Sequence, residues 1–224
     1  MANAPEDLFI LPACEAQIDL LYTDSTLLLI NKPSGLLSVP GRHPRNRDSV
    51  IARLQTQYPS AAIVHRLDFD TSGVMVVPLT RPALSQISRQ FQQRQVEKVY
   101  VAVVQGEMQA DEGEIDLPIA PDLEQRPKYK VCTASGKASL TRYRVLERDS
   151  LQGTTRVELF PVTGRSHQLR LHLHAIGHPI VGCSFYHSDT SAQMASRLLL
   201  HACELRFIHP LTGEHVAAKS AAPF

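Results

Sequence analysis

The sequence has no tryptophan, few cysteines and almost no net charge. Without tryptophan, it lacks the ring on which a carbohydrate-cleaving enzyme stacks a sugar, which argues against that class. The cysteines are far apart and form no CxxC pair, which argues against a zinc knuckle and a disulfide framework. A formal charge of +1 neither indicates nor excludes a nucleic-acid partner until the positions of the basic residues are known. The cysteines, which we expect to be reduced, are Cys14, Cys132, Cys183 and Cys203.

Long apolar runs are also missing. The longest ones, at 27–30 and 74–77, are far shorter than the roughly 20 residues that span a bilayer. Residues 1–12 lack the basic start and apolar stretch of a secretory signal. We therefore expect a soluble, cytoplasmic protein with no membrane partner. With 224 residues, 43% of them hydrophobic, the chain can bury a core as one large domain or two small lobes.

The hydrophobic pattern predicts many short strands and few helices. Alternation and turn signals predict strands at 20–22, 26–31, 74–79, 99–105, 139–146, 155–162, 198–208 and 215–219. Helical spacing predicts helices at about 48–58, with Asp48 as N-cap, at 81–95, with Thr80 as the cap candidate, and at 166–176, ended by Gly177. This order favours an α+β fold with a mixed, largely antiparallel sheet flanked by helices and loops.

The domain organisation follows from the same pattern. We expect an N-terminal extension at 1–18 and a single domain at 19–224. Residues 110–136 are rich in Pro, Gly, Asp and Lys, so they are the best candidate for an irregular excursion or a hinge between two lobes.

Two segments concentrate basic residues. Residues 40–48, PGRHPRNRD, contain no aliphatic side chain and predict a basic surface loop. A second group, which overlaps the last predicted helix, contains Arg165, His167, Arg170, His172 and His174.

Residues 64–73, VHRLDFDTSG, place Asp68 and Asp70 between two apolar runs. The following Thr-Ser-Gly predicts a turn, so the two carboxylates diverge and a paired-carboxylate site is disfavoured. Either aspartate could simply accept backbone N–H bonds in that turn, which is our interpretation for Asp70. A carboxylate beside apolar strands can act as a nucleophile if a fixed cation keeps it ionised. Arg165, which follows a glycine, is one such cation, although a solvated arginine at a helix entrance is the alternative.

Taken together, these motifs identify a family resemblance. The blocks DSTLLLINKPSGLLSVPG, HRLDFDTSG, EKVYVAVV, TGRSHQLRLH, GHPIVG and LLLHACELRFIHPLTGE occur in this order. From about residue 20 to the C-terminus, the chain resembles the RluA family of pseudouridine synthases. The SGLLSVPGR segment resembles the branch that modifies both tRNA and 23S rRNA.

The resemblance implies roles for particular residues. Asp68 is the implied catalytic carboxylate, Arg165 its ion-pair partner and Tyr100 the ring that stacks on the uracil. Arg66 would enter the RNA stack where the target uridine has swung out, and Leu169 would form part of the apolar pocket wall. One departure is visible, because Cys183 stands where the family usually has an acid. We expect this change to alter local hydrogen bonding more than catalysis.

The resemblance also implies partners. It predicts an isomerase with no cofactor and no metal, acting as a monomer on structured RNA in a central RNA-binding cleft. The expected RNA is a tRNA anticodon stem-loop, a 23S rRNA loop or both. The further substrate-binding residues are Lys32, Arg42, Arg45, Arg47 and Arg170. The first four would contact RNA phosphates, and the alternative for these four is that they form a solvated basic loop.

Three other readings remain. A metalloenzyme could use His172, His174 and His178, but Gly177 interrupts the helix and no carboxylate lies at ligand spacing. An RNA-binding module without activity would explain the basic segments but not Asp68. A glycoside hydrolase using Asp68 and Asp70 is the weakest reading, because such an enzyme needs its two carboxyl groups about 5 Å or more apart across a sugar and the chain has no tryptophan to stack on one.

Overall fold

The computed structural model describes residues 10–224, so the first nine residues of the predicted extension lie outside the described part. The chain forms two compact units. Unit 1 contains the described residues up to Val96 together with Arg206–Ser220, and unit 2 contains Glu97–Leu205 and Ala221–Phe224. Residues 110–136, the predicted hinge, lie wholly within unit 2.

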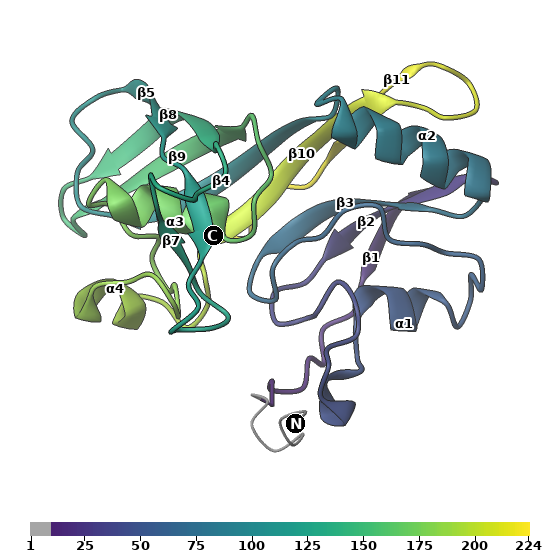
Figure 1. Cartoon of the computed structure of the whole chain (residues 1–224), viewed down its shortest axis with the longest axis horizontal. Coiled ribbons are helices and arrows are strands. Elements are labelled where there is room, and N and C mark those ends of the chain that lie inside the picture. Colours follow the sequence, from purple (N-terminus) through teal and green to yellow (C-terminus); the bar gives the residue numbers. More distant parts are fainter. Residues whose placement is uncertain (1–9) are drawn as a thin grey trace. The chain divides into compact units, whose positions relative to one another are not determined.

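Unit 1 is built on antiparallel strands whose apolar residues are buried (Figure 1). β2 is the middle strand of β1-β2-β3, and its pairing with β3 sets Ile30 opposite Met75. Both side chains are fully buried, as expected for strands that read as continuous apolar runs. The elements are β1 (Asp19–Thr23), β2 (Leu27–Lys32), the 3₁₀ helix η2 (Pro44–Asn46), α1 (Val50–Leu54), β3 (Ser72–Pro78), α2 (Arg81–Gln92) and β11 (His215–Lys219).

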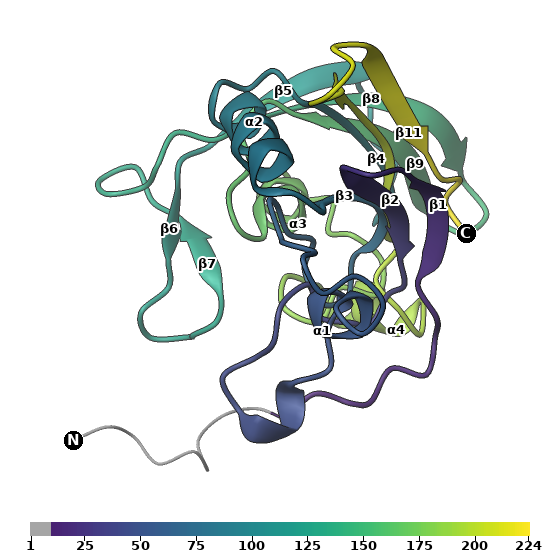
Figure 2. The same ribbon diagram turned by 90° about the vertical axis from the view of Figure 1, so that its right-hand side faces the viewer.

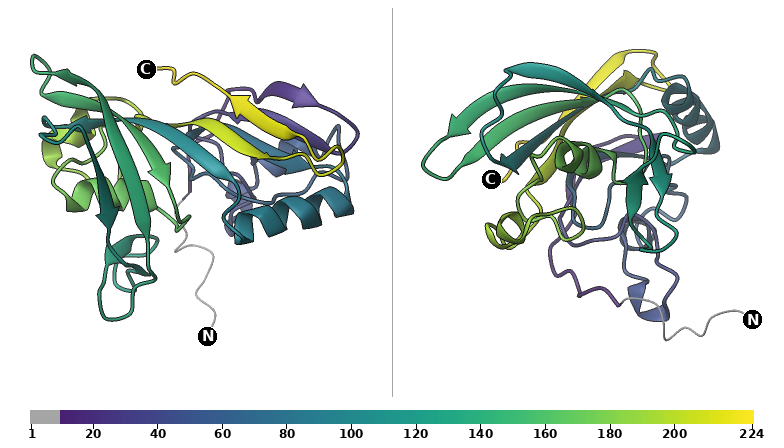
Figure 3. Two further views of the ribbon diagram at one scale, coloured as in Figure 1. Left: turned by 90° about the horizontal axis from the view of Figure 1, so that it is seen from above. Right: turned by 60° about the vertical axis from the view of Figure 1, so that its left-hand side comes forward.

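Unit 2 has its own antiparallel strands, in the order β4-β9-β8-β5, and a separate two-stranded ribbon, β6-β7 (Figure 2). Its core includes Ala102, Val157 and Leu173, none of which is exposed. The elements are β4 (Glu97–Gln105), β5 (Glu112–Asp116), β6 (Ile119–Pro121), β7 (Tyr129–Val131), β8 (Leu140–Asp149), β9 (Thr154–Pro161), α3 (Gln168–Ala175) and α4 (Asp189–Gln193). β10 (Leu200–Ile208) begins in unit 2, ends in unit 1 and pairs with β11 (Figure 3).

These elements confirm the α+β prediction with its largely antiparallel sheet, and they correct some details. α1 is much shorter than the predicted helix at 48–58, and its N-cap is Ser49, whose hydroxyl accepts from Ala52 N. Asp48 instead forms an ion pair with Arg53, with 2.6 Å between the carboxylate and the guanidinium. The predicted irregular segment at 110–136 contains β5, β6 and β7, and α4 was not predicted. Within residues 10–224, no helix is both long and apolar enough to cross a membrane.

Candidate active site

Asp68 lies in unit 1, in a turn that leads into β3. The amide of Thr71 donates to Asp68 O at 3.1 Å, which closes the turn predicted from Thr-Ser-Gly. The side chain of Leu67, just before it, is buried, whereas that of Arg66 is exposed and that of Asp68 is half-buried. The turn therefore carries a half-buried aspartate two residues after an exposed arginine.

Residues 32–38 hold the backbone of this turn, and we call them the brace. The Ser38 hydroxyl donates to Leu67 O at 2.7 Å and accepts from Leu67 N at 3.1 Å. Gly35 N donates to Phe69 O at 2.9 Å, and the Ser34 hydroxyl donates to Asp70 O at 2.7 Å. Because the backbone is bonded on both sides of Asp68, the position of its Cα is closely determined.

Lys32 is the innermost residue of the brace. Its side chain is fully buried, and its ammonium donates to the carbonyl oxygens of Pro33, Leu36 and Phe69 at 2.8, 2.7 and 3.1 Å. The prediction that Lys32 contacts RNA phosphates is therefore wrong, because an ammonium group enclosed by carbonyl oxygens is not presented to a ligand. Lys32 instead stabilises the turn that carries Asp68.

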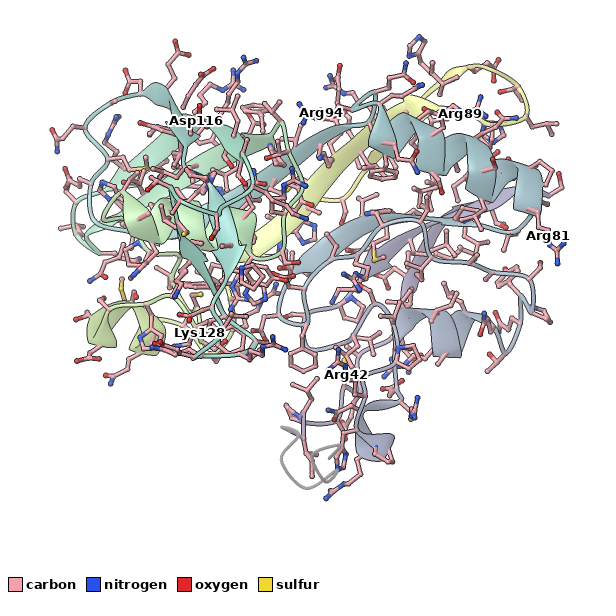
Figure 4. The ribbon with its side chains drawn as sticks, in the orientation of Figure 1. Arg42, Arg81, Arg89, Arg94, Asp116 and Lys128 are labelled. Atoms are coloured by element: carbon pink, nitrogen blue, oxygen red, sulfur yellow. The ribbon has the colours of Figure 1, made fainter. Side chains whose placement is uncertain are left out.

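The basic segment 40–48 forms the predicted surface loop around η2. Arg42, Arg45 and Arg47 are exposed, and none of the three forms an ion pair within the described residues. Figure 4 labels Arg42. Asn46 is buried between them and accepts from Leu11 N at 3.0 Å. The Arg53 guanidinium, which pairs with Asp48, also donates to the carbonyls of Ala16 and Cys14. The N-terminal extension is thus tied to the basic loop.

Arg165 lies in unit 2, in the turn between β9 and α3. Its amide donates to Gln168 Oε1 at 3.0 Å, and the Thr163 hydroxyl donates to the same oxygen at 2.8 Å. Gln168 Nε2 in turn donates to Leu140 O and Thr141 Oγ1, both at 3.0 Å. The buried Gln168 amide therefore fixes this turn to β8, while the Arg165 side chain stays exposed.

Two further predicted residues lie in the core of unit 2. Tyr100 is on β4 opposite Leu159, and its half-buried side chain packs against the core cluster. Leu169, on α3, belongs to that cluster and is 7% exposed. Asp68 and these two residues belong to different units.

Arg170 is buried, which contradicts its prediction as a substrate-binding residue. Its Nε donates to Cys183 Sγ at 3.4 Å, and its guanidinium lies over the rings of Phe185 and Tyr186 at 5.1 and 5.7 Å. The cation is thus held by the thiol at the position of the family's acid and by two aromatic faces.

Two of the three histidines of the metal hypothesis, His172 and His178, form hydrogen bonds, and His174 is exposed. His172 Nδ1 lies 3.0 Å from Thr141 Oγ1, and its Nε2 lies 3.0 Å from Leu117 O. His178 Nδ1 lies 3.0 Å from Gln105 O. Within residues 10–224, no group of three His, Cys, Asp or Glu side chains could hold a metal ion.

The sequence did not predict the roles of Ser38, which positions the turn that carries Asp68, and Gln168, which positions the turn that carries Arg165. Both residues occur in the motif blocks, but a serine or glutamine in a motif does not reveal its hydrogen-bond partners. The partners of Ser38 are 29 residues away, and those of Gln168 on β8 are 27 and 28 residues away.

Comparison with known proteins agrees with these motifs. The model of the RNA pseudouridylate synthase family matches residues 26–175. The dual-specificity RNA pseudouridine synthase RluA of Yersinia pestis is 52% identical over 204 residues, which cover 91% of this chain and 98% of the relative. The protein of the same name from Escherichia coli strain K12 is 49% identical, with 95% of this chain and 97% of the relative covered.

Solved structures agree as well. Human RNA pseudouridylate synthase domain containing 1 has a TM-score of 0.80 and 31% identity, over 95% of this chain and 86% of that one. Human RNA pseudouridylate synthase domain containing 4 has a TM-score of 0.71 and 26% identity, over 92% of this chain and 88% of that one. From its motifs, its matched family model and these relatives, we conclude that the chain belongs to the RNA pseudouridylate synthase family.

Proposed function

We propose that this protein isomerises uridine in both tRNA and 23S rRNA, and that Asp68 is the catalytic residue. Relatives named as dual-specificity enzymes, about half identical to this chain and covered almost from end to end, support the substrate range. The observation that carries the choice of Asp68 is the brace, because it bonds the backbone on both sides of this half-buried carboxylate.

The reaction needs no cofactor, because the atoms of uridine balance on both sides. The bond from N1 of the uracil to C1′ of the ribose breaks, the base rotates and C5 bonds to C1′. The proton on C5 leaves, and N1 gains a proton. Asp68 either attacks the sugar or assists formation of a glycal, and both routes require its anion.

Arg165 would keep Asp68 charged, and Tyr100 and Leu169 would position the uracil. Arg165 is the proposed counter-charge that keeps Asp68 ionised, since a guanidinium stays protonated at any physiological pH. Tyr100 would stack on the uracil, and Leu169 would contribute an apolar wall. Each role carries the family pattern over to the matching position in this chain.

The target base is reached by flipping. Extrusion of a stacked nucleotide costs a few kcal/mol. The exposed Arg66 would fill the gap, while Arg42, Arg45 and Arg47 would bind phosphates. The anticodon stem-loop of tRNA and a loop of 23S rRNA are the proposed substrates. The monomeric state and the cytoplasmic location stay predictions, which sedimentation and fractionation would test.

Tritium release tests the substrate range. Transcripts of single tRNAs and of 23S rRNA fragments would be made with uridine tritiated at C5, and the modified positions mapped by reverse transcription after carbodiimide treatment. We expect stoichiometric release at one or a few positions in each RNA class. Release from only one class would refute dual specificity, and release from neither would refute the proposed function.

A further inference from the structure

Helix α2 has one buried and one exposed face. Ala83, Ile87 and Gln90 are buried, and Gln90 anchors the helix, because its amide group exchanges two bonds of 2.8 Å with the backbone of Ile208. The opposite face exposes Arg81 and Arg89, and Arg94 is exposed just after the helix end (Figure 4). We call these three residues the arginine row.

The arginine row carries positive charge without compensation. Residues 71–96 contain no aspartate or glutamate. Within residues 10–224, no ion pair or side-chain hydrogen bond involves any of the three arginines. The exposed arginines of β8 differ, since each lies against a carboxylate: Arg142 against Glu114, Arg144 against Glu158 and Arg148 against Asp111.

Two members of the row occupy positions where an arginine opposes helix stability. Arg81 is the first residue of α2, and its charge opposes the positive end of the helix dipole; no acidic residue is present in that turn. Arg94 has φ of 58°, and the bonds Arg94 N→Phe91 O and Gln95 N→Gln90 O place it at the position where helices favour glycine. These arginines therefore do not serve to stabilise the helix.

We propose that the arginine row binds the phosphate backbone of the RNA stem that flanks the target uridine. This inference rests on the proposed function for its choice of RNA as the partner. A helical rise of 1.5 Å per residue puts Arg81 and Arg89 about 12 Å apart along the axis, a span that covers several phosphates of one strand. Guanidinium groups bind phosphate oxygens in a bidentate manner.

The chemistry of the face favours RNA over a protein partner. Besides the arginines, the exposed residues of α2 are Pro82, Ser85, Gln86 and Gln92, with no aromatic or large apolar side chain. Protein interfaces take most of their affinity from buried aromatic and apolar anchors. Arginine, serine and glutamine side chains are common donors to phosphate and sugar. The row would read no bases, so it would contribute equally to stems of different sequence.

The test removes the row and measures RNA binding as a function of salt. In the triple variant Arg81→Gln, Arg89→Gln, Arg94→Gly, we expect the slope of log affinity against log salt to fall by about 2–3, because each lost phosphate contact lowers it by about 0.7–0.9. We expect roughly a 10- to 100-fold loss of affinity at low salt for a stem-loop with an extended stem, and a smaller loss when the stem is cut short. Thermal melting should occur at an equal or higher temperature than in the wild type. The single variant Arg89→Gln, in the exposed middle of the helix, should lower the slope by about 1.

The matched control removes the same charge elsewhere. Arg142→Gln, Arg144→Gln, Arg148→Gln also loses three positive charges, but from a surface where carboxylates already balance them. We expect its slope to equal that of the wild type. An unchanged slope in the row variant, or an equal fall in the control, would overturn the proposal. Tritium release at saturating RNA separates the two claims: its absence in the wild type refutes the proposed function, whereas the slopes test the row by themselves.

Discussion

The hydroxyl of Ser38 exchanges two hydrogen bonds with the backbone of Leu67, to the oxygen at 2.7 Å and from the amide at 3.1 Å. Leu67 directly precedes Asp68, so the side chain of Ser38, 30 positions before Asp68, holds the backbone from which the Asp68 side chain extends. Both Ser38 and Leu67 are buried, and water therefore does not replace these bonds when one partner is removed.

Replacement of Ser38 by alanine should lower both stability and turnover. We expect the free energy of unfolding to fall by about 1–3 kcal/mol, because buried backbone groups of Leu67 lose their partner. In single-turnover assays the rate should fall while the Kd for RNA stays within about twofold. Unchanged turnover, in a variant that shows the expected loss of stability in urea, would contradict a positioning role for the brace.

Lys32 and Arg45 should respond in opposite ways. Lys32→Met should lower the free energy of unfolding by about 2 kcal/mol or more, because carbonyl oxygens in a buried site lose a charged donor. Its effect on RNA affinity in the folded fraction should not depend on salt. Arg45→Gln should leave stability unchanged within about 0.5 kcal/mol and lower the salt slope of RNA binding by about 1. Urea unfolding and RNA titrations at several salt concentrations measure both, and a reversal of the two patterns would refute the assignment.

His172 makes the stability of unit 2 depend on pH. Burial lowers the pKa of His172 below 6.5, despite the opposing effects of the bond to Leu117 and the charge of Asp116. The unfolded chain therefore binds a proton near pH 6.5 that the folded chain does not, and stability falls as the pH drops below 6.5. Urea midpoints at pH 7.5, 6.5 and 5.5 should show this fall in the wild type and in the exposed-site control His187→Gln. His172→Gln should show a smaller fall, and an equal one would contradict the prediction.

Cys183 offers a test of the departure from the family pattern. An aspartate there would lie beside the Arg170 guanidinium, whose Nε is 3.4 Å from the sulfur. We expect Cys183→Asp to keep the unfolding free energy within about 1 kcal/mol, because the lost packing is offset by a charged hydrogen bond. Cys183→Leu, which leaves Arg170 without this acceptor, should lower it by about 2 kcal/mol. Both should keep turnover per folded molecule, and a loss in Cys183→Asp would show that this position affects catalysis.

Local patterns in the sequence predicted most of the strands and helix α2. Thr80 caps α2 as predicted, because an N-cap acts on amides only a few residues away. The sequence does not decide between Asp48 and Ser49 as the cap of α1, because both residue types are good caps and sequence alone does not show that Arg53 engages the aspartate. Segment 110–136 looked irregular because its strands are short and lie among prolines and glycines.

The motif predicted which carboxylate to examine, but not how it is held. Most lysines are exposed, so the sequence does not reveal that Lys32 is buried, and only the fold shows three carbonyl oxygens around its ammonium. Arg170 lies in the same motif block as the exposed Arg165, yet its position on α3 places it in the core of unit 2. In both cases the decisive partner is distant in sequence, so spacing carries no signal.

The most direct test of the account compares Asp68→Asn with Asp70→Asn in single-turnover tritium release from RNA with uridine tritiated at C5. The two aspartates are two residues apart in the same turn, so the control matches the change in charge and location. We predict no measurable release with Asp68→Asn, RNA affinity within about threefold of the wild type, and substantial release with Asp70→Asn. Release by Asp68→Asn at a rate near that of the wild type would contradict the assignment of Asp68 as the catalytic residue.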